Sequence, residues 1–177
     1  MHAPPETGST SVHDDLAASV FWSSRAEVVI DRPPTEVWAV INDQDLETVR
    51  LWNPTVIRVD RLSGDNGQEN ELVLVTKDTD QSPFTMRTVR SVPNHQRVLR
   101  IDATDRSFCG FVDHSLYELE DGRTRVVYNG YLEYPSVPSG ELEGRTGAEA
   151  ARESMEYLNH GFGLLKQVVE ARVPAAA

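Results

Sequence analysis

The chain has 177 residues, the usual size of a single domain that can bury a core and enclose a cavity. Its 28 acidic and 17 basic residues give a net charge of −11, which opposes binding to nucleic acid and to anionic membrane surfaces. The single cysteine, Cys109, excludes an internal disulfide and a zinc site built from several cysteines, and it favours a reducing compartment. Because no secretory leader and no stretch of about eighteen apolar residues is found, we expect a cytoplasmic protein without stable membrane insertion.

Two regions are expected along the chain. Residues 1–23 form a mobile lead-in, because the first eleven are rich in Pro, Gly, Ser and Thr and offer little to bury. Residues 24–174 form one domain, since no internal repeat or linker divides them.

The domain opens with a strand and two short helices. Alternating apolar residues from Ala26 to Ile30 predict a half-buried strand. Pro33–Glu36 is typical of a helix start, with proline in the first turn followed by Thr and Glu. A second short helix is expected over Leu46–Leu51, and it ends before Pro54 because the residue preceding a proline avoids the helical region.

The middle of the chain reads as antiparallel strands separated by turn residues. Asp121-Gly122 is a strong signal for a two-residue hairpin turn between the last two strands. The expected strands are Val56–Leu62, Glu71–Lys77, Phe84–Val92, Arg97–Thr104, Phe108–Leu119 and Thr124–Tyr134.

The C-terminal segment Thr146–Val173 predicts a long amphipathic helix. At about 1.5 Å per residue it extends roughly 40 Å, so it should lie across the open face of the sheet. Gly161 and Gly163 interrupt its middle, which indicates either close packing on the sheet or a ligand or bend at that point. Its apolar stripe consists of Ala151, Met155, Leu158, Phe162, Leu165 and Val169.

The hairpin fixes which side chains should face the helix. A two-residue turn at Asp121-Gly122 pairs Glu118 with Arg125, and this charge pair marks the solvent face. A bulge in either strand would swap the faces beyond it. The inward residues predicted in this way are Phe111, Asp113, Ser115, Tyr117, Leu119, Val126, Tyr128 and Leu132. The same reasoning for the other strands gives Leu72, Leu74, Thr76, Phe84, Met86, Thr88, Arg90, Leu99, Ile101 and Ala103.

Several local motifs resemble the START-type helix-grip superfamily, also called SRPBCC, and within it the polyketide cyclase/dehydrase and lipid-transport group. The resemblance rests on Glu27–Ile30, Pro33–Trp38, Trp52-Asn53-Pro54 and the turn Asp121–Val126. It implies an α+β helix-grip fold, in which a curved seven-stranded antiparallel sheet wraps around the long C-terminal helix and two short helices follow the first strand. It also implies a deep apolar cavity for a hydrophobic small molecule. The superfamily includes carriers, receptors and enzymes, and it has no universal catalytic motif, so the fold alone does not separate these functions.

Four residues are candidates for chemistry in such a cavity. Asp113 would be a general acid or base, because a carboxylate facing an apolar cavity has a raised pKa; the alternative is a structural charge, for example one paired with Arg90. Tyr117 and Tyr128 would donate hydrogen bonds to a ligand carbonyl or an enolate oxygen, or else simply fill the core. Arg90 would hold a ligand carboxylate, or else reach water at the strand end.

The expected ligand contacts are large apolar or small polar side chains on the same surfaces. No pair of histidines has a metal-ligand spacing; His114 is expected on the outer face with Asn129, while His160 near the cavity mouth is a weak acid/base candidate. No phosphate-binding loop is found, so no phosphate-bearing nucleotide is expected. The histidine spacing predicts no metal site, and the expected chemistry needs no cofactor. The predicted ligand-binding residues are Trp52, Leu74, Met86, Phe111, Ser115, Met155, Leu158 and Phe162.

Three functions remain open on these grounds. The first is binding of an aromatic or polyketide-like molecule with cofactor-free cyclisation, dehydration or aldol-type chemistry. The second is a carrier or sensor of a lipid or other apolar metabolite, and the third a co-chaperone-like interaction module with an exposed apolar patch. The expected partner is a hydrophobic small molecule and not nucleic acid, and assembly as a homodimer is left open.

Overall fold

The computed structural model describes residues 20–79, 81–134, 141–142 and 145–172. Most of the predicted mobile lead-in, residues 1–19, lies outside the described residues. Its last part does not, because strand β1 runs from Val20 to Ile30 and so begins before the strand expected from residue 26.

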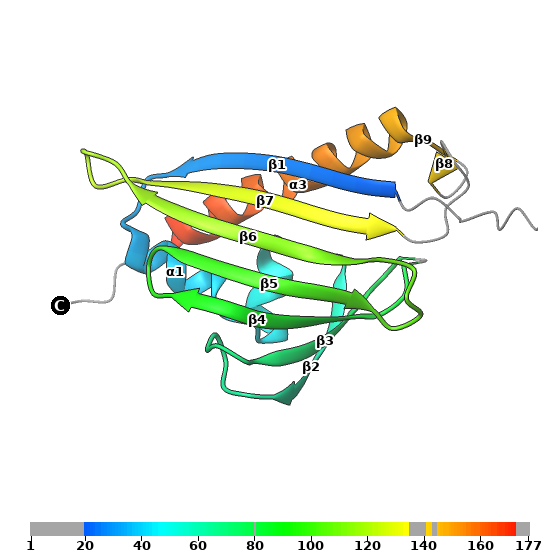
Figure 1. Cartoon of the computed structure of the whole chain (residues 1–177). Helices are drawn as coiled ribbons and strands as arrows, with labels where there is room; N and C mark the ends of the chain where they lie inside the picture. Colours follow the sequence, from blue (N-terminus) through cyan, green and yellow to red (C-terminus); the bar gives the residue numbers. More distant parts are fainter. Residues whose placement is uncertain (1–19, 80, 135–140, 143–144, 173–177) are drawn as a thin grey trace, which may run out of the picture.

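Seven strands form one antiparallel sheet in the order β1-β7-β6-β5-β4-β3-β2 (Figure 1). Every strand except β1 pairs with its sequence neighbour, and β1 joins by pairing with β7. After β1 the strands are β2 (Val56–Ser63), β3 (Leu72–Lys77), β4 (Phe84–Val92), β5 (Gln96–Ala103), β6 (Cys109–Glu118) and β7 (Thr124–Tyr134).

Three helices cover one face of this sheet. Helices α1 (Pro34–Ile41) and α2 (Leu46–Trp52) follow β1 directly, and α3 (Gly147–Ala171) extends behind β1 and β7 (Figure 1). A small hairpin of β8 (Glu141–Leu142) and β9 (Arg145–Thr146) precedes α3. The predicted α+β helix-grip fold is therefore confirmed, with its curved sheet, two short helices and long C-terminal helix.

The helices begin and end for the local reasons that the sequence predicts. Pro34 occupies the first turn of α1, where the missing N–H costs nothing, and α2 ends at Trp52 before Pro54. Helix α3 buries Phe162, Leu165 and Val169 from its predicted stripe. Burying each such side chain contributes about 1.5–3 kcal/mol, which holds α3 on the sheet.

The β6–β7 hairpin departs from the two-residue turn. The Leu119 N–H donates to the Arg123 carbonyl (2.8 Å), and the Gly122 N–H donates to the Leu119 carbonyl (2.9 Å), with Gly122 at φ +79°. This is a three-residue loop with a bulge at the glycine, which needs the left-handed conformation. The register shifts by one, so that Glu118 lies opposite Thr124 and Tyr117 lies opposite Arg125.

A one-residue shift turns every side chain of β6 to the opposite face. The predicted inward orientation of β7 is confirmed for Val126 and Tyr128, which pack in the core. The inward face of β6 is formed by Val112, His114 and Leu116, all buried. The residues predicted there, Phe111, Asp113, Ser115 and Tyr117, lie on the outer face, and that part of the prediction was wrong.

A second irregularity changes β4. Thr88 pairs with Leu99 and Arg90 with Val98, so Val89 is an extra residue in the strand. Arg90 consequently leaves the inner face and is exposed, contrary to the prediction. In β3 the inner positions are Val73 and Val75, which are almost fully buried, and not Leu72, Leu74 and Thr76.

The core has two parts that meet at the middle of the sheet. One packs α1 and α3 against β1, β6 and β7, and the other packs α2 against β3 to β6. Tyr128 contacts both parts. Between them the side chains leave space, and this space is the candidate site.

Candidate functional site

A cavity of about 300 Å³ lies between the inner face of the sheet and the helices. Strands β3 to β7 supply one wall, α2 and the segment after it supply a second, and α3 supplies a third. A second hollow of about 800 Å³ shares with it Thr55, Lys77, Phe84, Ile101, Val112, Tyr128, Tyr157 and Leu158, so the two are contiguous. Volumes of this order are usual for small-molecule sites.

Five of the predicted site residues line the cavity: Trp52, Met86, Tyr128, Leu158 and Phe162. Met155 packs against the α1–α3 part of the core, next to the stripe that carries Leu158 and Phe162, but it does not line the cavity. On α3 the predicted residues Leu158 and Phe162 thus line the cavity and Met155 does not, while Met86 in the first half of β4 lines it as predicted.

The other predicted residues lie elsewhere, most of them on the outer face of the sheet. Asp113 accepts hydrogen bonds from Gln96 Nε2 (3.0 Å), Ser115 Oγ (3.0 Å) and Asn129 Nδ2 (3.3 Å), which makes it a structural carboxylate. The rings of Tyr117 and Phe111 are about half exposed and pack beside Arg125 and Arg100. The residues that do not line the cavity are Leu74, Arg90, Phe111, Asp113, Ser115, Tyr117 and Met155.

The cavity instead contains a row of polar side chains that crosses the sheet. Arg97 of β5 lies directly opposite His114 of β6, and His114 lies opposite Tyr128 of β7. Side chains at opposed positions have Cβ atoms about 5 Å apart, so these three are neighbours on the inner face. The ring centroids of His114 and Tyr128 are 5.3 Å apart in an edge-to-face arrangement.

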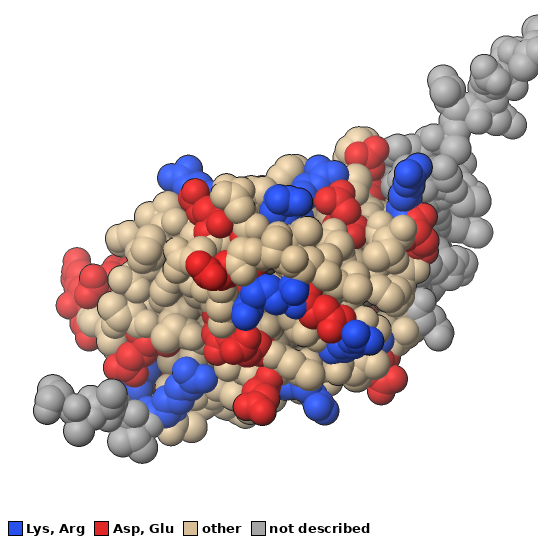
Figure 2. All heavy atoms as spheres, turned by 90° about the horizontal axis from the view of Figure 1, so that it is seen from below, with Lys and Arg blue, Asp and Glu red and all other residues tan. Residues whose placement is uncertain are grey.

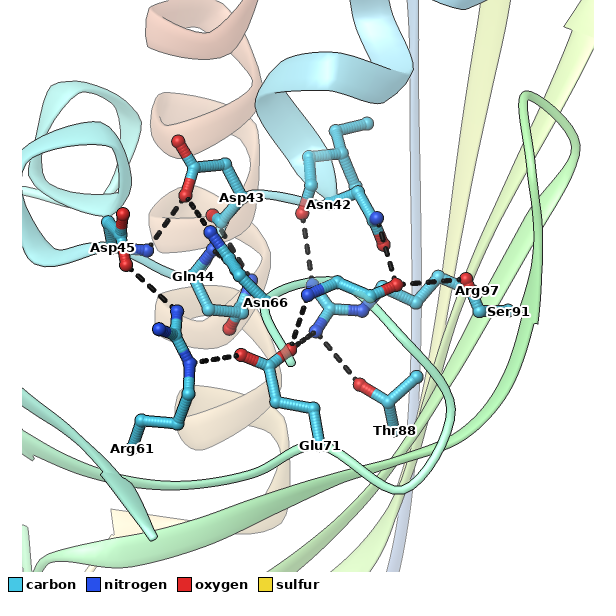
Figure 3. Close-up of polar contacts among 12 residues, drawn as sticks. Asn42, Asp43, Gln44, Asp45, Arg61, Asn66, Glu71, Thr88, Ser91 and Arg97 are labelled. Carbon is cyan, nitrogen blue, oxygen red and sulfur yellow. Dashed lines mark hydrogen bonds and ion pairs between the residues drawn. The ribbon is translucent and has the colours of Figure 1, made fainter. Parts of the chain in front are cut away.

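Arg97 is held in a buried network (Figure 3). Its Nη1 donates to the Ile41 carbonyl (3.1 Å), and its Nη2 donates to Thr88 Oγ1 (2.9 Å) and to Glu71 (3.3 Å). Burial lowers the pKa of Arg97 to about 10, against the opposing effect of Glu71, so the side chain stays charged at neutral pH. Its Nε has no hydrogen-bond partner among the residues that the structure describes.

Glu71 connects this network to the outside of the molecule. It is 1% exposed, and it accepts hydrogen bonds from the Gly67 N–H (2.8 Å) and from Arg61 Nε (3.2 Å) as well as from Arg97. Arg61 in turn pairs with the exposed Asp45 (2.8 Å). The network therefore ties the α1–α2 connection to the β2–β3 loop, as Figure 3 shows.

His114 is the buried titratable group nearest in register to Arg97. Burial, together with the positive charge of Arg97, lowers the pKa of His114 to about 4, so its imidazole is neutral at neutral pH. Its Nδ1 is buried and forms no hydrogen bond with any described residue. Tyr128 beside it is protonated, because burial raises the pKa of its hydroxyl to about 12.

Two further polar atoms, on cavity residues from the helical side, also lack a hydrogen-bond partner in the described part of the chain. They are Trp52 Nε1, a donor, and Gln44 Oε1, an acceptor. Buried polar groups normally find partners, and a group without one costs about 1–3 kcal/mol. Gln44, Trp52, Arg97 and His114, which line the cavity, thus each have one buried polar atom without a hydrogen-bond partner among the described residues.

The lining favours recognition and positioning of an oxygen-bearing apolar molecule. Arg97 and Tyr128 are donors toward a carbonyl or a developing oxyanion, and neutral His114 can accept a proton or share one. Among the described residues no aspartate or glutamate lines the cavity of about 300 Å³. The described part of the chain also brings together no group of three or more His, Cys, Asp or Glu residues that could hold a metal ion.

Sequence reasoning missed Arg97 and His114 for different reasons. Arg97 has the same parity as Leu99, Ile101 and Ala103, so the alternation in β5 was sufficient to place it inward, but Arg97 was not included among the inward residues. His114 depended on the loop type of the β6–β7 hairpin, which the Asp-Gly pair alone did not determine. His160, the predicted weak candidate near the mouth, does line the cavity.

Comparison with known proteins gives matches over nearly the whole domain. The Zhui aromatase/cyclase from a Streptomyces species superposes with a TM-score of 0.65 at 19% identity, covering 88% of this chain and 98% of that one. Ara h 8.0201 gives 0.64 at 12% identity, covering 86% and 100%, and a protein of Chromobacterium violaceum gives 0.60 at 14% identity, covering 85% and 98%. At these identities the likeness shows the fold alone.

Sequence comparison is more specific. No curated protein sequence matches. No helix in the described part of the chain is long and apolar enough to cross a membrane. The model of the family described as polyketide cyclase/dehydrase and lipid transport matches residues 22–170, which include every strand of the large sheet and nearly all of α3. The chain therefore belongs to the polyketide cyclase/dehydrase and lipid-transport family.

Proposed function

We propose that this protein binds an aromatic or polyketide-like small molecule in the cavity between the sheet and α3. The observation that carries the proposal is the combination of apolar walls with the row Arg97, His114 and Tyr128 along one of them. Apolar contact supplies affinity at about 25 cal/mol per Å² of buried surface, and the polar row fixes the orientation of an oxygen on the ligand. Binding needs no cofactor.

The test uses a neutral aromatic fluorophore, N-phenylnaphthylamine, and a variant with a filled cavity. Val112 lines both hollows, so Val112→Phe should reduce binding of the fluorophore by at least about tenfold. Val89→Phe, on the exposed bulge of β4, adds the same ring outside the cavity and should leave binding unchanged. Equal binding by wild type and Val112→Phe would place the ligand elsewhere. Native mass spectrometry of the purified protein identifies any molecule that it retains.

A second function, cofactor-free proton-transfer chemistry, is favoured by the position of His114. A neutral imidazole between Arg97 and Tyr128 can remove a proton next to a ligand carbonyl, while the two donors stabilise the oxyanion that forms. Cyclisation, dehydration and aldol-type reactions all pass through such an enolate. His114 thus takes the role that the sequence had suggested for Asp113.

One substitution separates the enzyme from the carrier. In an enzyme, His114→Gln should abolish turnover of the molecule identified by mass spectrometry but change its affinity by less than about threefold. In a carrier the wild type has no turnover, and the ligand is recovered unchanged. The Asp113→Asn variant is the control, because Asp113 lies on the outer face and its loss should leave turnover intact.

The surface charge supports a small molecule as partner and not nucleic acid. On the face shown in Figure 2, acidic and basic side chains are interspersed and form no basic stripe. Together with the net charge of −11, this gives phosphate backbones no favourable approach on that face.

A further inference from the structure

Lys77 occupies an unusual place for a lysine. It is the last residue of β3 and shares the inner face with Val73 and Val75, so its side chain is directed toward α3. Its ammonium lies 4.8 Å from the ring centroid of Tyr157 and 5.6 Å from that of Phe84. It lines both hollows, at the point where they join.

The two lysines of the chain differ in their contacts. The other lysine, Lys166, pairs with Glu170 (2.8 Å) and donates to the Val29 carbonyl, whereas Lys77 forms no ion pair with any described residue. Its contacts are the faces of two aromatic rings, which attract a cation but accept few of its three N–H donors. The ammonium thus lies over two aromatic rings at the junction of the two hollows.

Arg97 and Lys77, which both line the cavity, differ in how their positive charges are balanced. Arg97 is already paired with Glu71 and anchored to the Ile41 carbonyl and Thr88, so its charge is balanced within the protein. Lys77 is the cavity-lining cation without such a partner among the described residues, and His114 is neutral. A negatively charged ligand group is therefore favoured at Lys77 and not at the polar row.

We propose that the ligand of this cavity is an amphiphilic organic acid, whose carboxylate binds Lys77 between Tyr157 and Phe84. Its apolar body extends toward Phe162, and a second, uncharged oxygen reaches Arg97 and His114. The inference rests on the proposed function, since it names the class of ligand for the same cavity.

The test compares two competitors of the same shape, naphthoate and naphthamide, for displacement of the neutral fluorophore N-phenylnaphthylamine at neutral pH. In the wild type, naphthoate should bind more tightly than naphthamide. Lys77→Met should weaken naphthoate by about tenfold and naphthamide by less than about twofold, because only the former loses a charge-assisted hydrogen bond. Lys77→Arg should retain most of the preference for the acid.

Arg25→Met is the matched control. It removes one positive charge from an exposed position of β1 and should leave the ratio between the two competitors unchanged. A ratio that is the same in wild type and Lys77→Met overturns the role of Lys77, while binding of the fluorophore shows that the cavity still takes apolar ligands. If the fluorophore itself fails to bind the wild type, the proposed function fails as well.

Discussion

At the scale of single residues, the inner face of the sheet carries more buried charge than an apolar cavity requires. Arg97 is 1% exposed and Glu71 is 1% exposed, and each has partners that compensate the loss of water. A buried ion pair contributes little net stability, yet removing one member leaves an uncompensated charge at high cost. These residues are better understood as a rigid wall that fixes the orientation of Arg97 and, next to it, of His114.

Removal of the Glu71 charge tests this wall. Glu71→Gln should lower the free energy of unfolding by about 3 kcal/mol, because Arg97 then remains charged and buried with only neutral partners. Urea unfolding with linear extrapolation measures the change. Asp45→Asn removes a carboxylate from the exposed end of the same network and should cost less than about 1 kcal/mol. Similar losses in the two variants would contradict a special role for the buried end.

Protonation of His114 should make the protein sensitive to moderate acid. The pKa of His114 is about 4 in the folded protein against 6.5 when unfolded, so between these values the unfolded chain binds the extra proton. Stability from this residue is therefore complete above pH 6.5 and is lost as the pH falls toward 4, by about 3 kcal/mol in all. Urea unfolding of wild type and His114→Gln across this range measures the effect, and the variant should show a correspondingly weaker dependence. Parallel pH profiles would show that His114 is not the group responsible.

At the scale of elements, the sequence predicts where each strand and helix lies but not always which way it faces. Strands β4 and β7 match their predicted ranges, because alternation and turn residues are local properties. The predicted faces of β3, of β6 and of the end of β4 were wrong, and for the last two the face depends on a single bulge: Gly122 in the hairpin loop and Val89 in β4. Whether a bulge forms is decided by which face packs better in the whole sheet, so Asp113 and Arg90 were placed inside while His114 was placed outside.

Replacing two glycines by alanine tests two separate effects on stability. Gly122 tests the backbone conformation of the hairpin loop, and Gly163 tests the helix propensity of α3. Gly122→Ala should destabilise the protein by about 1 kcal/mol, because alanine disfavours the φ of +79° in the hairpin loop. Gly163→Ala should stabilise it by about 0.5–1 kcal/mol, since it lies within α3 and an added Cβ meets no atom within 4 Å. Thermal unfolding measures both. Shifts of the same sign would mean that one of these local environments differs from the structure.

At the scale of the whole molecule, the long helix and the curved sheet do not fill the space between them. The sequence could predict this arrangement because the apolar stripe of α3 and the strand order are encoded over long segments. It could not predict which side chains line the space, since a shift of one residue in the register of a strand exchanges its two faces. The apolar part of the lining, on Trp52, Met86, Leu158 and Phe162, was the predictable part, whereas the polar row was not.

Because stability and binding depend on the same unfilled space, filling it with a larger side chain should raise the stability of the protein and abolish binding of the fluorophore. Saturating N-phenylnaphthylamine, at about 100 times its Kd, should stabilise the wild type by about 2.7 kcal/mol, or roughly 5–10 °C in Tm for a domain of this size. Val112→Phe should have a Tm at or above that of the unliganded wild type and no further increase with the fluorophore, since its ring occupies the junction of the two hollows. Val89→Phe, in contrast, should show the full increase. Differential scanning calorimetry of the three proteins decides the matter: a ligand-induced increase that persists in Val112→Phe would mean that the fluorophore binds outside the cavity.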